Sequence, residues 1–507
     1  MHHSDSATVT TVDTLAKLLD VCGELRASEQ VDERAVTGCS FDSRAVSAGD
    51  VFFCKGAAFK PAFLSMALDA GAVAFVCEES LVESLAQESG AAMLVVDSVR
   101  TAMALLPPEV YDRPDHDVKI VGITGTKGKT TAAFMLQSII KAAGESCGMI
   151  GSVSTDDGIE CYESTNTTPE APEVWRQSMV MEVSSQALKY QRVENLPFDV
   201  ACFLNIGRDH ISPIEHPTFE DYFESKLRIF DQAKTAVVNL GTEEVDRVLE
   251  AASTAERLVT VGVEHPEASL WASDVRMVGF NIEFNLHGLC ADESEAGEKV
   301  LLGIAGDFNV ENALVAIAAA HEIGIGIDAI KKGLSKLRVP GRMEVVESKD
   351  GRVICVVDYA HNQLSFRSLF SSVKRAFPTS PVIAVFGAAG GKAQERREQL
   401  PREAAPYSDL MIFANEDPAH EDPMKVCREL AEHVPDDTPN EIILDREAAV
   451  HAAFKAAREE YVSPNAPTIV LLLAKGDEEL MHVGDEFVPI ESDLSLANRL
   501  IDVTQFD

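Results

Sequence analysis

The sequence has few basic residues, and this shortage argues against several kinds of partner. Lysine and arginine number 44 against 82 aspartates and glutamates, which gives a formal net charge of −38. A field of that sign repels nucleic acid, so we expect no nucleic-acid partner. Anionic small molecules must therefore be met by local clusters of lysine, arginine and backbone N–H groups.

The sequence also lacks long apolar runs and paired cysteines. No run approaches the roughly 18 apolar residues expected of a membrane span, and the first residues, MHHSDSATVTTVDTL, contain no apolar signal segment. The 10 cysteines form no C-x-x-C pair, so we expect neither a zinc site nor a disulfide framework. These absences predict a cytosolic protein with no membrane partner, and we expect a monomer.

The length and the turn-rich stretches predict three domains. A chain of 507 residues is long enough for about three domains of ordinary size. Stretches rich in proline and charge at 107–117 (PPEVYDRPDHD) and in turn residues at 337–342 (LRVPGR) divide it. We predict an N-terminal domain of residues 1–113, a central domain of 114–337 and a C-terminal domain of 338–507.

Apolar strands alternate with helical stretches along all three parts, which predicts an α/β fold. Strands such as VKIVGIT and FDVACFLNI predict a parallel sheet in the central domain. Five apolar strands from VICVVD to TIVLLLA predict a second doubly wound, Rossmann-like unit at the C-terminus. Between about 258 and 304, short strands separated by turn residues predict an antiparallel insertion.

The strongest local signal is a glycine-rich loop between an apolar strand and a helix. Its residues are Gly125, Thr126, Lys127, Gly128, Lys129, Thr130 and Thr131. Glycines let backbone N–H groups face phosphate oxygens, and the helix N-terminus adds partial positive charge. Lys129 can reach the β- and γ-phosphates, and Thr130 can offer its hydroxyl to Mg²⁺. Ile123 stands where the general pattern has glycine, so this is a variant phosphate loop, which alone indicates a nucleotide binder.

Further motifs give this chain a resemblance along nearly its whole length. They are TGTKGKTT (124–131), NTTP (166–169), EVSS (182–185), NIGRDH (205–210), YFESK (222–226), GDFN (306–309) with Asn312, PGRME (340–344), DYAHN (358–362), AKGDE (474–478) and, near the N-terminus, DSR (42–44) with GD (49–50). In this order the motifs resemble those of the Mur ligase superfamily, and within it the MurE group. One departure is the spacing from Thr168 to Glu182, which is shorter than usual by about one helix.

The resemblance implies a three-domain ligase and a reaction. The N-terminal α/β domain would hold the UDP end of the substrate, the central phosphate-loop domain ATP, and the C-terminal domain a free diamino acid. The D-glutamate γ-carboxylate of UDP-N-acetylmuramoyl-L-alanyl-D-glutamate would attack the γ-phosphate of ATP, and an amine would then attack the resulting acyl phosphate. Such a ligase serves peptidoglycan precursor synthesis, and through it cell-wall growth, cell shape and cell division.

The resemblance also assigns candidate catalytic and metal-binding residues. Lys129 would screen the negative charges that meet in the reaction. Thr130 and Glu182 resemble ligands of a first Mg²⁺, and His210 resembles a ligand of a second. A protonated lysine cannot bind a metal, and the resemblance implies that Lys226 is carbamylated, which turns a cation into an oxygen anion.

Substrate contacts are assigned in the same way. Candidates for the UDP-sugar-dipeptide are Ser43, Thr167, Thr168, Ser184 and Arg192. Candidates for the adenine, a phosphate and the ribose of ATP are Asn312, Arg342 and Asp358, in that order.

The amino-acid pocket is expected around residues 415–423 and includes Arg397, Asp417, Pro418, Ala419 and Glu478. In the branch that adds meso-diaminopimelate, an arginine that grips the substrate's far carboxylate stands where this chain has Ala419. The acid-rich loop here suits a side chain that ends in an ammonium group. L-lysine is therefore the preferred substrate, with L-ornithine and meso-diaminopimelate left open.

Three other functions remain open from the sequence. A folylpolyglutamate-synthetase-like ligase would share the phosphate loop, but the DSR and NTTP segments favour a UDP-sugar. A non-catalytic nucleotide-binding homologue would explain the short 168–182 spacing, yet the candidate catalytic set is retained. A phosphate-loop ATPase coupled to motion would need a second acidic strand motif, and none is evident.

Overall fold

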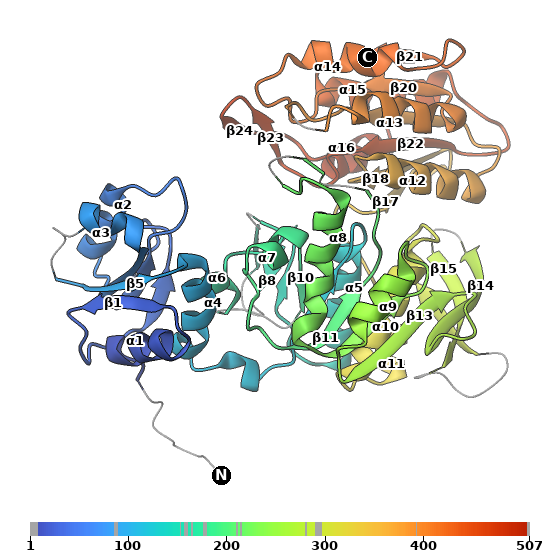
Figure 1. The fold of residues 1–507 in the computed structure, drawn as a ribbon. Coiled ribbons are helices and arrows are strands. Elements are labelled where there is room, and N and C mark those ends of the chain that lie inside the picture. The colour runs from blue at the N-terminus through green and yellow to red at the C-terminus, as the bar shows by residue number, and fades with distance from the viewer. Residues whose placement is uncertain are drawn as a thin grey trace. The chain divides into compact units, whose positions relative to one another are not determined.

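The computed structural model describes residues 9–85, 90–152, 154–156, 161–163, 166–175, 180–208, 211–212, 215–278, 281–288, 297–391 and 393–503 (Figure 1). The chain forms two compact units. The first comprises Met1–Trp271, Gly288–Cys290 and Leu314–Ile330, and the second comprises Ala272–His287, Ala291–Ala313 and Lys331–Asp507. Within the described residues, no helix combines the length and the apolar character that crossing a bilayer requires.

The first unit begins with a small sheet covered on both faces. Its strands are β1 (Leu25–Glu29), β2 (Gly38–Ser40), β3 (Asp50–Phe53), β4 (Ala74–Glu78) and β5 (Ala92–Val96), in the order β1-β5-β4-β3-β2. All neighbours are parallel except β1 and β5. Val51 and Phe53 pack against α1 (Val12–Val21) and α4 (Val99–Val110), whereas Phe52 packs on the opposite face with residues of α2 (Pro61–Asp69) and α3 (Glu79–Leu85). Strands buried on both faces explain the continuous apolar runs in the sequence.

The helix α4 extends further than its sequence suggests. Pro107 and Pro108 lie inside it, in a stretch that we had read as a boundary, and the helix ends at Val110. A short 3₁₀ helix, η1 (Pro114–His116), follows before the next sheet. The predicted domain limits at 113 and 337 themselves stay predictions.

The larger sheet of the first unit places the phosphate loop. Its strands are β6 (Val121–Thr124), β7 (Met149–Ile150), β8 (Ser154–Asp156), β9 (Cys161–Glu163), β10 (Val180–Glu182), β11 (Phe198–Phe203), β12 (Ala233–Asn239) and β13 (Arg257–Val263), in the order β13-β12-β11-β6-β10-β7-β8-β9. From β13 to β7 the neighbours are parallel. The expected antiparallel insertion was therefore wrong at its start, because β13 extends the parallel sheet.

Helices accompany the strands of the first unit, and two of them carry Lys129, Thr130 and Lys226. Between β6 and β13 the helices are α5 (Lys129–Ala143), α6 (Ala171–Val174), α7 (Ser185–Lys189), α8 (Phe219–Leu227), η2 (Arg228–Gln232) and α9 (Val245–Ala252). The one-turn α6 lies in the segment whose spacing is unusually short, and 176–179 are outside the described residues. Thr218 caps α8 by accepting a hydrogen bond from the backbone N–H of Asp221, which fixes where the helix bearing Lys226 begins.

The second unit contains an antiparallel group and a doubly wound sheet. The group includes β15 (Asn281–Gly288) and β16 (Glu298–Leu302), which pair antiparallel as expected, and β14 (Leu270–Val278) precedes them in the chain. Helices α10 (Asn309–Glu322) and α11 (Ile327–Ser335) follow in the chain and include residues of both units.

The doubly wound sheet has the order β17-β18-β22-β19-β20-β21. Its strands are β17 (Glu344–Glu347), β18 (Val353–Asp358), β19 (Val382–Phe386), β20 (Leu410–Phe413), β21 (Asn440–Ile442) and β22 (Thr468–Leu473). All neighbours are parallel except β17 and β18. This confirms the predicted α/β class for the C-terminal part.

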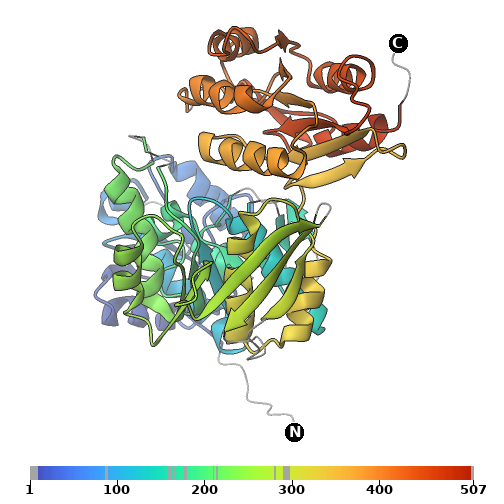
Figure 2. The same ribbon diagram turned by 90° about the vertical axis from the view of Figure 1, so that its right-hand side faces the viewer.

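Helices cover both faces of this sheet (Figure 2). They are α12 (Gln363–Ala376), α13 (Arg396–Ala404), η3 (Ala405–Tyr407), α14 (Pro423–Glu432), α15 (Arg446–Glu459) and α16 (Asp493–Leu500). Residues of α15 and α16 pack in one cluster with alternate residues of the strands. Phe366 of α12 packs edge-on against Phe386 of β19, with ring centroids 5.1 Å apart. A hairpin of β23 (Leu480–Val483) and β24 (Glu486–Pro489) follows β22.

Candidate functional site

The phosphate loop lies between β6 and α5, where the chain order of the sheet reverses. Strand β6 has β10 on one side and β11 on the other, so its carboxyl end opens at a switch point where α/β proteins bind ligands. Gly128 is the N-cap of α5 and has φ 85°, a left-handed conformation that favours glycine. The sequence prediction of a strand, a curled loop and a helix is confirmed.

Asn205 fixes the shape of this loop. Its side-chain Oδ1 accepts a hydrogen bond from the Lys127 backbone N–H at 2.9 Å, and its Nδ2 donates to the Lys127 carbonyl at 3.2 Å. Lys129 folds over the same loop, and its Nζ donates to the Gly125 carbonyl at 2.9 Å. Asn205 belonged to a matched motif without an assigned role. The sequence feature that could have identified Asn205 is a polar side chain just after β11, the strand beside β6.

Thr130 and Glu182 meet as predicted. The Thr130 hydroxyl donates to Glu182 Oε2 at 3.0 Å, and the Glu182 side chain is buried. Ser152, which we had not predicted, donates to the Glu182 carboxylate from its backbone N–H at 2.7 Å and from its hydroxyl at 3.2 Å. Its hydroxyl also lies 3.0 Å from Thr167 Oγ1. Thr130, Glu182, Ser152 and Thr167 thus form one hydrogen-bonded chain of oxygen-bearing side chains beside the phosphate loop.

Lys226 reaches the phosphate loop from α8. Its Nζ donates to the Gly125 carbonyl at 2.9 Å and lies 3.5 Å from Thr124 Oγ1, and the side chain is buried. Tyr222, one turn earlier, donates from its hydroxyl to Thr126 Oγ1 at 3.0 Å. Lys226 therefore lies beside the phosphate loop, about 100 residues away in the sequence, and its carbamylation stays a prediction.

Only some of the predicted magnesium ligands lie in the described residues, and their fit to a divalent cation is judged from those. Thr130 and Glu182 supply hard oxygen donors, which suit Mg²⁺. His210 lies outside the described residues. Among the residues the structure does describe, no group of three or more histidines, cysteines, aspartates or glutamates is gathered as in a metal site. Of the predicted set, Thr130 and Glu182 thus lie in contact and Lys226 lies at the phosphate loop, whereas the metal site itself stays a prediction.

Three of the predicted substrate residues form one hydrogen-bonded group. The Thr168 hydroxyl donates to the Glu182 carbonyl at 2.8 Å and accepts from the Ser184 backbone N–H at 3.0 Å. Arg192 Nη1 donates to the Thr168 carbonyl at 3.0 Å. Ser43 lies in the loop after β2, where its hydroxyl is 4.0 Å from the Met66 sulfur.

The residues predicted to contact the adenine, a phosphate and the ribose of ATP lie in the second unit. Asp358 ends β18, where its carboxylate accepts hydrogen bonds from the backbone N–H groups of Met343 at 2.8 Å and Ala360 at 2.7 Å. Burial raises the pKa of Asp358 above its ordinary value. Arg342 packs its guanidinium 4.4 Å from the centre of the Tyr359 ring. Asn312 donates to Asn309 Oδ1 at 3.0 Å.

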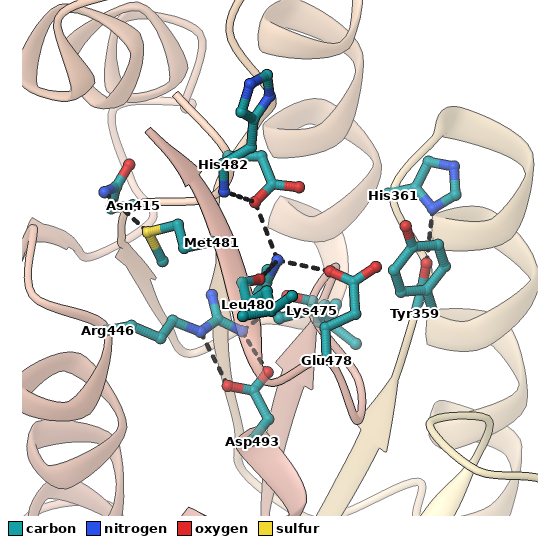
Figure 3. A network of polar contacts seen from close by, with 12 residues as sticks. Tyr359, His361, Asn415, Arg446, Lys475, Glu478, Leu480, Met481, His482 and Asp493 are labelled. Carbon is teal, nitrogen blue, oxygen red and sulfur yellow. Dashed lines mark hydrogen bonds and ion pairs between the residues drawn. The ribbon is translucent and has the colours of Figure 1, made fainter. Parts of the chain in front are cut away.

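Residues predicted for the amino-acid pocket lie after the carboxyl ends of β20 and β22, beside the switch point of the second sheet. At their centre is Lys475, whose Nζ donates to Asp417 Oδ1 at 3.0 Å, to Glu478 Oε2 at 2.5 Å and to the Leu480 carbonyl at 2.8 Å (Figure 3). The two acids raise the pKa of Lys475, although burial opposes them. Asp417 and Glu478 are therefore brought together as predicted, but around a lysine of the chain itself.

Arg397 and Ala419 shape the loop around this lysine. Arg397 is buried and pairs with Glu421 at 2.8 Å and Glu429 at 2.5 Å. Ala419 has φ 49°, and its N–H donates to the His482 carbonyl at 3.0 Å, which joins the loop to β23. A Cβ on Gly390 would lie 1.9 Å from the carbonyl oxygen of Pro418, so the loop needs glycine at that position. Arg397 thus orients the loop through its acids.

Glu416 belongs to the acid-rich loop of the predicted amino-acid pocket, although it was not among the assigned site residues. Its side chain is buried, and Oε2 has no hydrogen-bond partner among the described residues. Burial, helped by nearby Asp417, raises the pKa of Glu416 to about 7. Arg446 lies near enough to lower that pKa, but its guanidinium is itself held by Asp493 at 2.5 Å. The signal for Glu416 in the sequence is an acid that follows the apolar strand β20 after Ala414 and Asn415.

The glycine loop at a switch point, together with a second doubly wound sheet, defines a phosphate-loop protein of the α/β class. The sequence matches the model of the Mur ligase middle domain over residues 123–320 and that of the Mur ligase glutamate ligase domain over residues 341–476. It is 34% identical over 489 residues to the UDP-N-acetylmuramoyl-L-alanyl-D-glutamate–L-lysine ligase of Enterococcus faecalis, with 94% of each chain covered. The chain belongs to the Mur ligase family and is a ligase.

Solved structures show the same fold. A UDP-N-acetylmuramoyl-L-alanyl-D-glutamate–2,6-diaminopimelate ligase matches with a TM-score of 0.66 and 22% identity, covering 97% of this chain and 99% of that one. The MurF ligase of Thermotoga maritima in complex with ADP matches with a TM-score of 0.60 and 20% identity, covering 86% and 94%. At these identities the likeness concerns the fold.

Proposed function

We propose that the protein uses ATP to join L-lysine to UDP-N-acetylmuramoyl-L-alanyl-D-glutamate during peptidoglycan precursor synthesis. The observation that carries this proposal is one continuous network in the first unit. Thr130 of the phosphate loop connects through Glu182 to Thr168, Ser184 and Arg192. A phosphate donor and an anionic acceptor would meet there. The near full-length likeness to a lysine-adding ligase supports the same substrate.

The chemistry would proceed in two balanced steps. An oxygen of the D-glutamate γ-carboxylate attacks the γ-phosphorus of ATP, the bond to the β-phosphate oxygen breaks, and ADP leaves. The lysine α-amine then attacks the acyl carbon, phosphate departs with the former carboxylate oxygen, and the amine loses a proton. Lys129 and the N–H groups of the loop stabilise negative charge in the first step. Arg192 is suited to orienting an anionic group of the acceptor.

Magnesium and the carbamate belong to the same proposal. Thr130 and Glu182 would hold Mg²⁺, which would supply positive charge beside the phosphates. We propose that CO₂ carbamylates Lys226, because a carbamate replaces a buried ammonium with an oxygen anion next to Gly125. His210 would complete the set. The reaction would take place in the cytoplasm, and we expect a monomer.

The preference for lysine rests on the charges of the second unit. Asp417 and Glu478 place two carboxylates on one ammonium group, that of Lys475, and the loop that carries Asp417 also holds Glu416, Glu421 and Asp422. This excess of acid favours a substrate whose side chain ends in an ammonium group. Ala419 offers no guanidinium for a distal carboxylate, and leaving such a carboxylate unpaired would be costly.

Phosphate release tests this function directly. Purified protein with ATP, Mg²⁺ and UDP-N-acetylmuramoyl-L-alanyl-D-glutamate is assayed separately with L-lysine, L-ornithine and meso-diaminopimelate, and the peptide product is identified by mass. We expect the highest kcat/KM with L-lysine. Turnover with meso-diaminopimelate alone would refute the pocket argument. Turnover only with a folate and L-glutamate would instead support the folylpolyglutamate-synthetase-like alternative.

A further inference from the structure

Three basic side chains of the first unit converge on one buried carboxylate. Lys55 Nζ lies 2.7 Å from Glu170 Oε1, Arg192 Nε lies 3.2 Å from the same oxygen, and Arg100 Nη1 lies 3.7 Å from Oε2. The Glu170 side chain is only 10% exposed. We call Lys55, Arg100, Arg192 and Glu170 the Glu170 cluster.

The Glu170 cluster lies between the two parts of the proposed substrate site. The ammonium of Lys55 is 4.5 Å from the centre of the Phe41 ring, two residues before Ser43. Glu170 follows Thr168 by two residues, and Arg192 donates to the Thr168 carbonyl. Arg100, in the first turn of α4, also donates to the Tyr190 carbonyl at 3.3 Å. The cluster therefore connects the loop after β2 with the Thr168–Ser184 group.

The charge of the Glu170 cluster is unbalanced. Three cations pair with the one carboxylate of Glu170, and the nearby Glu173 carboxylate accepts from the Glu170 backbone N–H at 3.3 Å, so cations still outnumber acids here in a chain whose acids outnumber its bases by 82 to 44. Gathering cations in a partly buried place is unfavourable unless an anion compensates them. The Arg192 Nε is buried and lacks a hydrogen-bond partner among the described residues, because Glu170 is near it but poorly aligned. The geometry is thus suited to a further anion.

We propose that Lys55 and Arg100 join Arg192 in binding an anionic group of the UDP-linked substrate, and that Glu170 partly occupies this site until the substrate binds. This inference rests on the proposed function. The group would be the diphosphate or a carboxylate of the dipeptide, since both are oxyanions that accept charge-assisted hydrogen bonds. On binding, the substrate competes with Glu170 for the three cations.

Replacing the two new cations tests the binding role. Lys55→Met and Arg100→Met should each raise the KM for the UDP-linked substrate about tenfold, the loss expected for one charge-assisted hydrogen bond. The KM values for ATP and L-lysine should stay within twofold. Arg26→Met removes a surface arginine of β1, paired with Asp97 at 2.5 Å, and should leave all three KM values unchanged. An unchanged substrate KM in both cluster variants would refute the inference.

The isosteric substitution Glu170→Gln distinguishes two roles of Glu170: competition with the substrate for the three cations, or a purely structural role in the cluster. If Glu170 competes with the substrate, losing its charge should lower the KM for the UDP-linked substrate about threefold or more. If the cluster serves only to join its segments, the variant should melt at a lower temperature with an unchanged or raised KM. That second result would overturn the proposal.

Calorimetry with two ligands identifies the anionic group. UDP alone should lose affinity in Lys55→Met and Arg100→Met if the diphosphate is bound, whereas only the full dipeptide substrate should lose affinity if a carboxylate is bound. Equal affinity of wild type and variants for both ligands would refute the site. A wild-type enzyme that forms no tripeptide would instead refute the proposed function, so the two failures are distinguishable.

Discussion

Lys226 and Glu416 are buried titratable side chains, and their charge states decide which ligands can lie beside them. Lys226 donates to the Gly125 carbonyl of the phosphate loop at 2.9 Å. Glu416 has a buried oxygen without a hydrogen-bond partner among the described residues. A single substitution at each residue tests what its charge contributes to activity or stability.

Lys226→Ala should reduce kcat by about a hundredfold or more, because the charge near the γ-phosphate is lost. If Lys226 acts as a carbamate, added formate or acetate should restore part of the activity by supplying an oxygen anion. The measurement is phosphate release with and without the acid. Lys234→Ala, which removes an exposed lysine paired with Asp199, is the matched control and should remain fully active. A fully active Lys226→Ala enzyme would remove this residue from the mechanism.

Glu416 should make stability depend on pH. Burial raises its pKa to about 7 in the folded protein, so the folded state holds this proton more tightly than the unfolded state does. The stabilisation is complete below the ordinary pKa of about 4.5 and is lost as the pH rises to about 7. Relative to Glu416→Gln, the wild type should lose on the order of 3 kcal/mol between pH 4.5 and pH 7.

Urea unfolding of both proteins at pH 5 and pH 8 measures this difference, because other titrating groups contribute equally to the two. Bound L-lysine should lower the pKa of Glu416 and so release a proton, which calorimetry in buffers of different ionisation enthalpy detects. A wild type and a Glu416→Gln variant with parallel pH profiles would contradict a raised pKa.

The helix α5 and its two glycine caps are the element on which nucleotide binding depends. Gly128 begins the helix with φ 85°, and Gly144 ends it with φ 88°. Both have left-handed conformations, but only the first lies in the phosphate loop. A Cβ on Gly144 would meet no atom within 4 Å, so its replacement adds backbone strain alone.

Gly128→Ala and Gly144→Ala should therefore destabilise the protein by similar amounts, about 1 kcal/mol each. Only Gly128→Ala should raise the KM for ATP, by severalfold, since strain there turns backbone N–H groups away from the phosphates. Thermal melting and initial-rate kinetics measure the two effects. An equal rise in the KM for ATP in both variants would show that stability, not loop geometry, is responsible.

The sequence predicted the elements better than it predicted the contacts among them. Periodic apolar runs identified β6, β11 and β18 because strands buried on both faces have a strong local signal. Pro107 and Pro108 indicated a break, yet they lie within α4, since the packing of that helix outweighs their local preference. Lys55 pairs with Glu170, and Lys475 pairs with Asp417. The partners of each pair are distant in the chain, so no local sequence pattern predicted these contacts. The Lys226 position followed from resemblance, because a lysine in a helix pattern is otherwise ordinary.

At the scale of the whole molecule, the large negative charge is the main feature not explained by any one site. A net charge of −38 destabilises a compact state through self-repulsion, which salt screens. The melting temperature should therefore rise by a few degrees between about 0.02 M and 0.5 M KCl. Thermal melts at matched pH test this. A lower melting temperature in high salt would mean that local ion pairs, such as Arg446 with Asp493, dominate over the overall repulsion.

The central claim is that the phosphate loop and the Glu182 network convert a substrate carboxylate into an acyl phosphate. The most direct measurement uses UDP-N-acetylmuramoyl-L-alanyl-D-glutamate labelled with ¹⁸O in its γ-carboxylate, with ATP and L-lysine. Mass analysis of the released phosphate should find one ¹⁸O atom for each tripeptide formed, because the carboxylate oxygen leaves with phosphorus. Phosphate released without label, while tripeptide accumulates, would contradict the account.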